Sequence, residues 1–352
     1  MPLTAYLYSQ KISAPFLTDN EWNHVKKSLK QNPEYLHFKC CNSPVYARVS
    51  KKGLRHFVHK NTDSCNYIHE SEDHLLLKLE VYKACQDNGW DAEIEFAGDN
   101  FRADVLASNG KHKVVFEIQL TRQDFQTTVD RQRAFEEADI RCAWFFKRIP
   151  KDYRPDKFLP AFELVTENNK LIAPYKCNIS GEMMPVRECV QLLLDSKIRF
   201  REKLTLRKKQ KVRFYLFEEE CWKCGSKFKA IGLWSILKSK CNLRIDNNNF
   251  DIDDLAIEIK NYTEEIKSIE PDIAVYVKRF NKKINKFEWV NRCPECKAVY
   301  SYDILRSKVM KSVSEDDVPK EEISYCTNNN DDSSSQKRPH WCIKGPEGFC
   351  DN

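Results

Sequence analysis

The chain has 352 residues, and 58 lysine and arginine residues against 52 aspartate and glutamate residues give it a formal charge of +6. It is 41% hydrophobic and 31% charged, a composition typical of a globular protein of two or three domains. No apolar run approaches the roughly 18 residues of a membrane helix, and the N-terminal sequence has no hydrophobic signal core. The 15 cysteines are too scattered for a small disulfide framework. We therefore expect a cytoplasmic protein with no membrane segment, in which some cysteines bind zinc.

The first patterned segment runs from residue 38 to residue 65, within an N-terminal region of residues 1–66. A strand-like VYARV run is followed by a Lys-Lys-Gly turn, and cysteine and histidine residues lie at both ends. A bound metal would help to close so small a module. Cys40 or Cys41, His56 or His59, and Cys65 offer the ligands.

The next segment, residues 67–150, predicts an α/β domain. A helix begins after Ser71, which is a suitable N-cap followed by two acidic residues, and it ends at Asn88-Gly89. Strand-like runs follow at 90–97, 101–107 and 113–120, then a helix at 122–138 and a strand at 140–146. A helix between the last two strands makes a parallel crossover, whereas the shorter earlier connections suit antiparallel pairing. We expect a mixed sheet flanked by helices.

The rest of the chain divides by composition into three segments. Residues 151–215 indicate a connector that ends in a basic helix, because Lys197–Arg213 holds nine basic residues and one acid. Residues 216–312 contain Cys221-x-x-Cys224 and Cys293-x-x-Cys296, which predict a C-terminal Cys₄ zinc-binding region; the alternative is two unrelated reduced pairs. Residues 313–352 are rich in Ser, Asn and Asp, so we expect a flexible tail.

The main functional argument comes from the hairpin between residues 101 and 120. Asn109-Gly110 predicts a two-residue type I′ turn, in which Arg102 faces Glu117. Asp104 and Glu117 then lie diagonally on one face of the sheet, with Cα atoms about 7–8 Å apart. Two such carboxylates can hold one Mg²⁺ or Mn²⁺ ion, which suits phosphodiester hydrolysis. The alternative is a half-solvated polar face on which Arg102 neutralises Glu117.

A helical stripe lies upstream of this hairpin. Glu70, His74 and Lys78 recur every four residues and therefore share one side of the predicted helix. This stripe either lies beside the hairpin carboxylates or forms ordinary surface ion pairs.

As an ordered set, these motifs resemble the competence protein CoiA family, a branch of the PD-(D/E)XK nuclease superfamily. The resemblance covers about residues 35–147. Its motifs are Pro44-Val45, His56-Phe57-x-His59 with Cys65, Glu70-Ser71-x-x-His74-x-x-x-Lys78, Arg102-Ala103-Asp104-Val105, Phe116-Glu117-Ile118-Gln119, Phe125-x5-Arg131-x3-Phe135 and the strand of Trp144.

The resemblance implies a restriction-endonuclease-like core in which Asp104 and Glu117 hold the metal and Glu70 assists. Gln119 occupies the position where much of the superfamily has lysine, and an amide can position water only by hydrogen bonding. The resemblance also implies that Arg131 either contacts DNA phosphate or forms a structural salt bridge.

The resemblance extends to an N-terminal zinc-finger-like module. The family pattern has a CxxC before Pro44, where this chain reads Phe-Lys-Cys-Cys. We favour Cys41, His59 and Cys65 as zinc ligands, with either Cys40 or His56 as the fourth.

These observations predict a metal-dependent DNA nuclease or DNA-processing protein. Besides Arg131, the basic residues Arg207, Lys208 and Lys209 are candidates for DNA contact, although the basic stretch could equally be a solvated helix paired with nearby glutamates. The alternative function is a non-catalytic, zinc-stabilised nucleic-acid-binding or adaptor protein. The sequence has no GxxxxGK[ST] loop, so ATP-driven DNA handling would require a partner protein.

Overall fold

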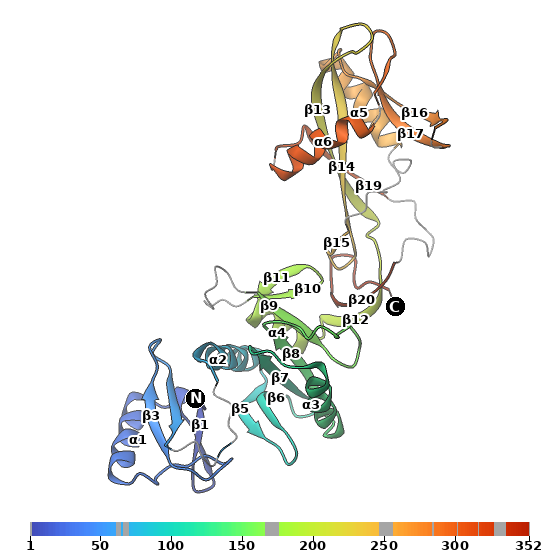
Figure 1. Ribbon diagram of the computed structural model, residues 1–352. Helices are drawn as coiled ribbons and strands as arrows, with labels where there is room; N and C mark the ends of the chain where they lie inside the picture. The colour runs from blue at the N-terminus through green and yellow to red at the C-terminus, as the bar shows by residue number, and fades with distance from the viewer. Residues whose placement is uncertain are drawn as a thin grey trace. The chain divides into compact units, whose positions relative to one another are not determined.

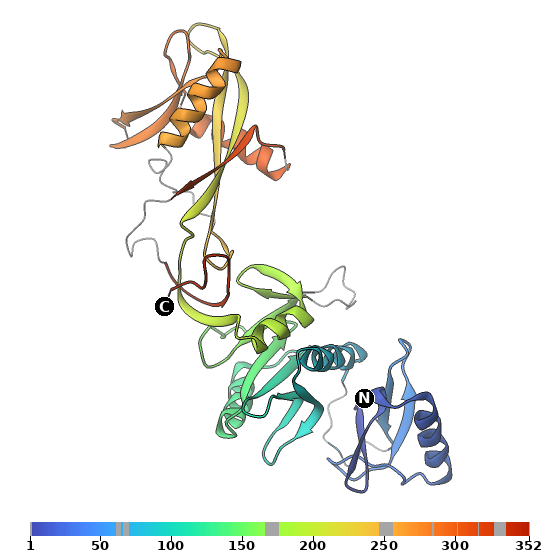
Figure 2. The ribbon, with the colours of Figure 1, turned by 180° about the vertical axis from the view of Figure 1, so that it is seen from behind.

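The computed structural model describes residues 2–60, 65, 70–165, 176–245, 256–283, 285–300, 302–315, 317–326 and 336–351. The chain forms two compact units (Figures 1 and 2). Unit 1 comprises Met1–Glu202 and Pro339–Lys344, and unit 2 comprises Lys203–Arg338 and Gly345–Asn352. In the described part of the chain, no helix is long and apolar enough to cross a membrane.

Unit 1 begins with two small antiparallel hairpins and a helix. The elements are β1 (Thr4–Leu7), β2 (Gln10–Ser13), the 3₁₀ helix η1 (Ala14–Phe16), α1 (Asp19–Gln31), β3 (Val45–Val49) and β4 (Arg55–His59). Thr18 and Glu21 form a reciprocal capping box at the start of α1, which fixes where this helix begins. Trp22 of α1 packs against Phe57 of β4 in the small hydrophobic core of this region.

The centre of unit 1 is a mixed sheet, as the sequence predicts, and it has seven strands. The elements of this region are α2 (Glu72–Asp87), β5 (Asp91–Ala97), β6 (Arg102–Ser108), β7 (Lys113–Gln119), α3 (Phe125–Glu137), β8 (Arg141–Phe146), β9 (Ala161–Val165), β10 (Lys176–Ile179), β11 (Glu182–Pro185), α4 (Val186–Leu194) and β12 (Ile198–Leu204). The strand order is β11-β10-β9-β8-β7-β6-β5. The β7–β8 and β8–β9 pairs are parallel and the others are antiparallel. Strands β9 to β11 extend this sheet beyond residue 150, where the sequence suggests a boundary.

Helices cover both faces of this sheet. Phe116 of β7 is fully buried in a core cluster with Leu75 of α2, whereas the adjacent Val115 belongs to the cluster that contains Phe135 of α3. Because successive residues of a strand point to opposite faces, α2 and α3 lie on opposite sides of the sheet. Figure 1 labels both helices.

The β6–β7 hairpin differs from its predicted register by two residues. Ser108 pairs with Lys113, so the connection contains four residues instead of two. The backbone N–H of Asn109 donates to the His112 carbonyl oxygen at 3.1 Å. The side-chain oxygen of Asn109 accepts a hydrogen bond from the backbone N–H of His112 at 3.0 Å. A register shift of two residues does not by itself transfer a side chain to the other face of the sheet. It moves Asp104 from a position diagonal to Glu117 to one level with it.

Unit 2 is built mainly from a long β-ribbon and two helices. Its elements are β13 (Lys209–Glu220), β14 (Lys227–Lys238), β15 (Arg244–Ile245), α5 (Ala256–Ile269), β16 (Val275–Asn281), β17 (Lys286–Arg292), β18 (Val299–Tyr300), α6 (Tyr302–Ser314) and β19 (Glu321–Cys326). One sheet has the order β15-β14-β13-β19 and the other has the order β16-β17-β18.

The basic stretch Lys197–Arg213 forms β12 and the beginning of β13, so the predicted basic helix is wrong. Val212 and Phe214 are fully buried and alternate with charged residues, which is the period of a half-buried strand. Arg213, on the other face, contacts Glu322 of β19 at 3.0 Å. Strand β13 also runs without a break through residues 215 and 216, where a domain boundary was expected.

The segment 313–352 contains strands where a flexible tail was expected. β19 pairs with β13, and Val212 lies opposite Ile323. Pro339–Lys344 belongs to unit 1 and includes most of the last strand, β20 (Gln336–Ile343), which pairs with β12. Apolar residues at alternating positions of β20 favour a strand over a flexible tail. One of them, Trp341, contacts the ring of Phe162 at a centroid distance of 5.8 Å. The Ser- and Asn-rich run 327–335 lies outside the described residues.

Candidate active site and metal centres

Asp104 of β6 and Glu117 of β7 lie where the β6–β7 ladder ends. The last regular pair is Val105 with Phe116. Beyond that pair, side chains take over the hydrogen bonds between the strands. The Asp104 N–H donates to Glu117 Oε1 at 3.2 Å, and the Ile118 N–H donates to Asp104 Oδ2 at 2.9 Å. The backbone therefore holds the two carboxylates level with each other across the strands.

The helical stripe predicted from the sequence does meet Asp104. Lys78 Nζ lies 2.9 Å from Asp104 Oδ1 and 2.7 Å from Glu70 Oε1. His74 Nε2 lies 3.2 Å from Asp104 Oδ2. The Ser71 side chain accepts a hydrogen bond from the His74 N–H and so caps α2 beside the cluster. Residues separated by about 30 positions are thus brought together.

Glu95 is a member of this cluster that sequence reasoning missed. It interrupts the β5–β6 ladder opposite Asp104, where its φ is 50°, and its carboxylate lies 3.6 Å from Lys78 Nζ. The same carboxylate accepts hydrogen bonds from the N–H groups of Leu3 and Thr4, both at 3.0 Å. A glutamate within a strand pattern gives no sign of a positive φ, so the sequence offers no means of finding it.

Arg131 of α3 forms an ion pair with Glu117 Oε2, so of its two expected roles the structure shows the salt bridge. Its guanidinium group also lies 5.1 Å from the ring centroid of Trp144. Arg102, considered as the neutralising partner of Glu117, is exposed. The cation beside Glu117 therefore comes from the helix after the hairpin.

Gln119 lies at the end of β7, and its amide is directed towards the following loop. Gln119 Nε2 donates to the carbonyl oxygen and to the hydroxyl oxygen of Thr121, at 3.1 and 2.8 Å. The structure therefore does not direct this amide at Asp104 and Glu117.

The two central carboxyl groups have opposite electrostatic environments. Burial raises the pKa of Asp104, but the charges of Lys78 and His74 outweigh burial and hold this pKa well below its ordinary value. Burial and the nearby Asp104 raise the pKa of Glu117 to about 8, although Arg131 acts in the opposite direction. The surroundings therefore favour the ionised form of Asp104 and the protonated form of Glu117.

The cluster around Lys78 contains ligand atoms that suit a divalent cation. Ligand atoms of Glu70, His74 and Asp104 all lie within 4.8 Å of one another. Glu70 Oε2 is buried, and no described residue forms a hydrogen bond with it. A buried carboxylate oxygen without a partner is costly, and a bound cation would satisfy it.

The two CxxC pairs of unit 2 converge on one point. Cys221 Sγ lies 3.5 Å from Cys296 Sγ, and Cys224 Sγ lies 3.8 Å from Cys293 Sγ. Sulfur ligands at 2.3 Å from a tetrahedral zinc ion would be about 3.8 Å apart. Hydrogen bonds with Ser226 lower the pKa of Cys224 to about 6, which favours the thiolate that binds metal. The four thiols can therefore hold a metal ion.

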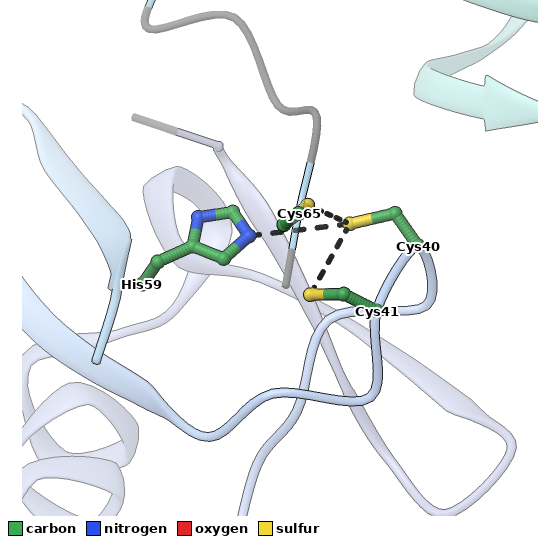
Figure 3. A group of neighbouring side chains, drawn as sticks. All are labelled: Cys40, Cys41, His59 and Cys65. Atoms are coloured by element: carbon green, nitrogen blue, oxygen red, sulfur yellow. Dashed lines mark hydrogen bonds between the residues drawn. The ribbon is translucent and has the colours of Figure 1, made fainter. Parts of the chain in front are cut away.

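A second cluster of possible metal ligands lies in the N-terminal region of unit 1 (Figure 3). Cys40 Sγ lies 3.7 Å from Cys41 Sγ, 3.5 Å from Cys65 Sγ and 4.0 Å from His59 Nε2. Of the two alternatives for the fourth position, the structure places Cys40 in the cluster. His56 instead contacts the Leu54 carbonyl oxygen through Nδ1 at 3.1 Å.

The basic residues Arg207, Lys208 and Lys209 lie at the start of unit 2. Arg207 Nε donates to the Ser239 carbonyl at 3.1 Å. The backbone N–H groups of Lys208 and Lys209 donate to the Glu347 carboxylate, at 2.9 and 3.4 Å. Both lysine residues are exposed.

Comparison with known proteins identifies the segment that contains the carboxylate cluster. Residues 70–217 match the family model described as competence protein CoiA, nuclease-like domain. This range begins at Glu70 and includes Asp104, Glu117 and Arg131. A search of curated proteins finds no match to the chain.

Proposed function

We propose that the protein is a divalent-metal-dependent DNA nuclease, because residues 70–217 match the family model of the competence protein CoiA, nuclease-like domain. In this proposal the mixed sheet and its helices form a restriction-endonuclease-like core, and the protein has a role in processing DNA. The observation that carries it is the pair Asp104 and Glu117, joined by hydrogen bonds at the end of a ladder, with Asp104 beside the Glu70 oxygen that no described residue satisfies.

In this proposal Asp104 and Glu117 hold Mg²⁺ or Mn²⁺, and Glu70 assists them. The bound cation would neutralise charge on the phosphodiester and lower the pKa of a water molecule. Lys78 is only 2% exposed, so its role is to keep Asp104 ionised, not to contact substrate. His74 is half-buried beside Asp104 and is placed to accept or return a proton. Gln119 would position the attacking water after turning away from Thr121.

Arg131 links this site to a neighbouring cavity. A cation bound by Glu117 would compete with the guanidinium group for the same carboxylate. The cavity, of about 410 Å³, is lined by Arg102 and Arg131, and it gives the released guanidinium group a place beside a DNA phosphate. We propose further DNA contacts at Arg207, Lys208 and Lys209, which would make binding strongly dependent on salt.

Zinc would stabilise the protein at two further places. Cys221, Cys224, Cys293 and Cys296 provide four sulfur ligands in unit 2, which leave no open position for chemistry. The N-terminal cluster of Cys40, Cys41, His59 and Cys65 provides three sulfur ligands and one nitrogen ligand. ATP-driven handling of the DNA would come from a partner protein.

The proposal is tested by cleavage of supercoiled plasmid, linear duplex and single-stranded DNA with Mg²⁺, with Mn²⁺ and with neither. Asp104→Asn and Glu117→Gln should each reduce cleavage at least a hundredfold, because each removes a carboxylate from the proposed metal site. Asp91→Asn, an exposed carboxylate at the start of β5, is the matched control and should cleave like wild type.

Cleavage that persists undiminished in Asp104→Asn would refute the assignment of the site. Tight DNA binding by folded, zinc-loaded protein that cleaves none of the three substrates would favour the alternative, a non-catalytic zinc-stabilised binding protein.

A further inference from the structure

The β16–β17 hairpin of unit 2 carries an unusual excess of positive charge. Residues 275–292 contain six basic residues and one acidic residue, Glu288. Glu288 accepts a hydrogen bond from Asn281 Nδ2 at 2.9 Å. Lys278, Arg279, Lys282 and Lys283 are exposed. So many like charges on one hairpin repel one another and favour a polyanionic partner.

One face of the same hairpin presents a ladder of aromatic rings. Tyr276 and Trp289 are stacked, with centroids 5.5 Å apart, and they pack into the core of unit 2. Phe280 and Phe287 lie directly opposite each other nearer the tip, with centroids 5.2 Å apart and ring planes at 65°. Lys278, on the same face, places Nζ 5.6 Å from the Phe287 centroid. Aromatic rings and a cation therefore share one surface.

The rings near the tip are exposed to an extent that pairing within the hairpin does not explain. Phe280 is 43% exposed and Phe287 is 65% exposed, whereas Tyr276 is 8% exposed. Cross-strand aromatic pairs do stabilise hairpins. This stabilisation comes from the contact between the two rings, and the outer surface of each ring remains exposed to water.

We propose that this face of the β16–β17 hairpin binds single-stranded DNA (Figure 1). Bases would stack on Phe280 and Phe287, and the backbone phosphates would lie along Lys278, Lys282 and Lys283. Stacking on a phenyl ring requires an unstacked base, so a duplex could use only the positive charges. The proposal rests on the proposed function for the choice of DNA as the nucleic acid. It adds that the substrate has a single-stranded part.

The test is fluorescence anisotropy of a labelled oligothymidylate and of a matched duplex, using the full chain in buffer without added Mg²⁺ or Mn²⁺. The double variant Phe280→Leu, Phe287→Leu keeps apolar bulk but removes both rings. It should bind the single strand at least tenfold more weakly and bind the duplex as before. The double variant Phe280→Tyr, Phe287→Tyr keeps two ring faces and should bind the single strand like wild type.

A second pair of variants tests the charge. Lys282→Glu, Lys283→Glu should weaken binding and reduce its salt dependence, since each phosphate contact contributes to the slope of affinity against salt. Lys26→Glu, Lys27→Glu makes the same charge change on exposed lysines of α1 and should leave the affinity unchanged.

The proposal fails if the leucine variant binds the single strand as tightly as wild type does, or if the duplex binds equally tightly. Tenfold tighter binding of the same sequence as RNA would overturn the choice of DNA. Since no divalent ion is added, these results are independent of cleavage. Loss of nuclease activity and loss of hairpin binding are therefore separate outcomes.

Discussion

The proton on Glu117 competes with any metal ion for the same oxygen atoms. Burial and Asp104 raise the pKa of Glu117 to about 8, so this group must lose a proton when it becomes a ligand. We expect Mn²⁺ affinity to rise about tenfold per pH unit up to about pH 8 and to level off above it. Titration calorimetry between pH 6 and 9 measures this slope.

The control for this pH dependence is Glu117→Gln, which has no proton to lose at that position. Its weaker Mn²⁺ affinity should vary much less between pH 7 and 8. An equal slope in the variant and in wild type would assign the proton to another group.

Lys78 stabilises unit 1 by neutralising the acidic residues that surround it. It is 2% exposed and lies within 4 Å of Glu70, Glu95 and Asp104. Lys78→Met should lower the free energy of unfolding by about 3–5 kcal/mol at pH 7, because it leaves buried carboxylates without a cation. Urea unfolding measures this loss, and Lys83→Met, at an exposed position of α2, is the matched control.

The pH dependence of this loss has a definite sign. The folded pKa of Asp104 lies below its unfolded value, so its stabilising contribution is present above the unfolded pKa and is lost as the pH falls. The difference between wild type and Lys78→Met should therefore shrink between pH 5 and pH 3. A difference that grows in acid would contradict this account.

At the residue scale, the sequence predicts which residues gather at the site but not the contacts that they make. Strand alternation predicts that Asp104 and Glu117 lie on one side of the sheet, but the regular pairing breaks at Asp104. In the structure Asp104 contacts Lys78 of α2 and Glu117 contacts Arg131 of α3, and these two helices lie on opposite sides of the sheet. The partner of Glu117 depends on where α3 crosses the sheet, and sequence spacing does not specify that. Arg131 rather than Arg102 therefore supplies the cation.

At the scale of elements, the two cysteine turns of unit 2 have equivalent backbone hydrogen bonds but different residues after the second cysteine. Gly225 and Lys297 each follow the second cysteine and have φ values of 72° and 60°. Lysine in this left-handed region costs about 1 kcal/mol relative to glycine. Lys297→Gly should therefore raise the stability of the zinc-loaded protein by up to about 1 kcal/mol, measured by thermal unfolding.

The reciprocal change tests the same reasoning. Gly225→Ala places a Cβ atom where no described atom lies within 4 Å, so only the backbone conformation opposes it. It should destabilise the protein by about 1 kcal/mol. Lys297→Ala, which keeps the left-handed strain, should have little effect.

Two elements show why local sequence patterns fail. Asn109-Gly110 favours a two-residue turn, but the Asn109 side chain bonds the His112 N–H and stabilises a longer loop. In the basic stretch, charge density suggested a helix, whereas the alternation of Val212 and Phe214 was the informative pattern. Its partner strand, β19, lies about 110 residues further along the chain, and a local pattern carries no information about it.

At the scale of the whole molecule, each unit contains one cysteine-containing cluster of possible metal ligands that lies entirely within it, among the described residues. Cys224→Ser should remove one equivalent of zinc and lower the stability of unit 2, because zinc binding contributes directly to folding. Cys41→Ser should do the same for unit 1. Metal analysis and hydrogen exchange of the full chain measure the two effects.

These two variants act as controls for each other. Each should leave amide protection in the other unit unchanged, since the four ligands of each cluster belong to a single unit. Zinc content that stays at the wild-type value in either variant would show that its cluster does not bind this metal.

Residues 339–344 belong to unit 1 although they follow most of unit 2 in the sequence, and this affects folding during synthesis. The Lys344 N–H donates to the Lys197 carbonyl at 2.9 Å, and Trp341 packs on the central core through Phe162. Residues 203–338, nearly all of unit 2, lie between the two parts of unit 1 in the sequence. A ribosome must therefore translate almost all of unit 2 before unit 1 can be completed. During synthesis, the apolar surface that later receives Trp341 stays uncovered, which makes the nascent chain a natural client for a chaperone.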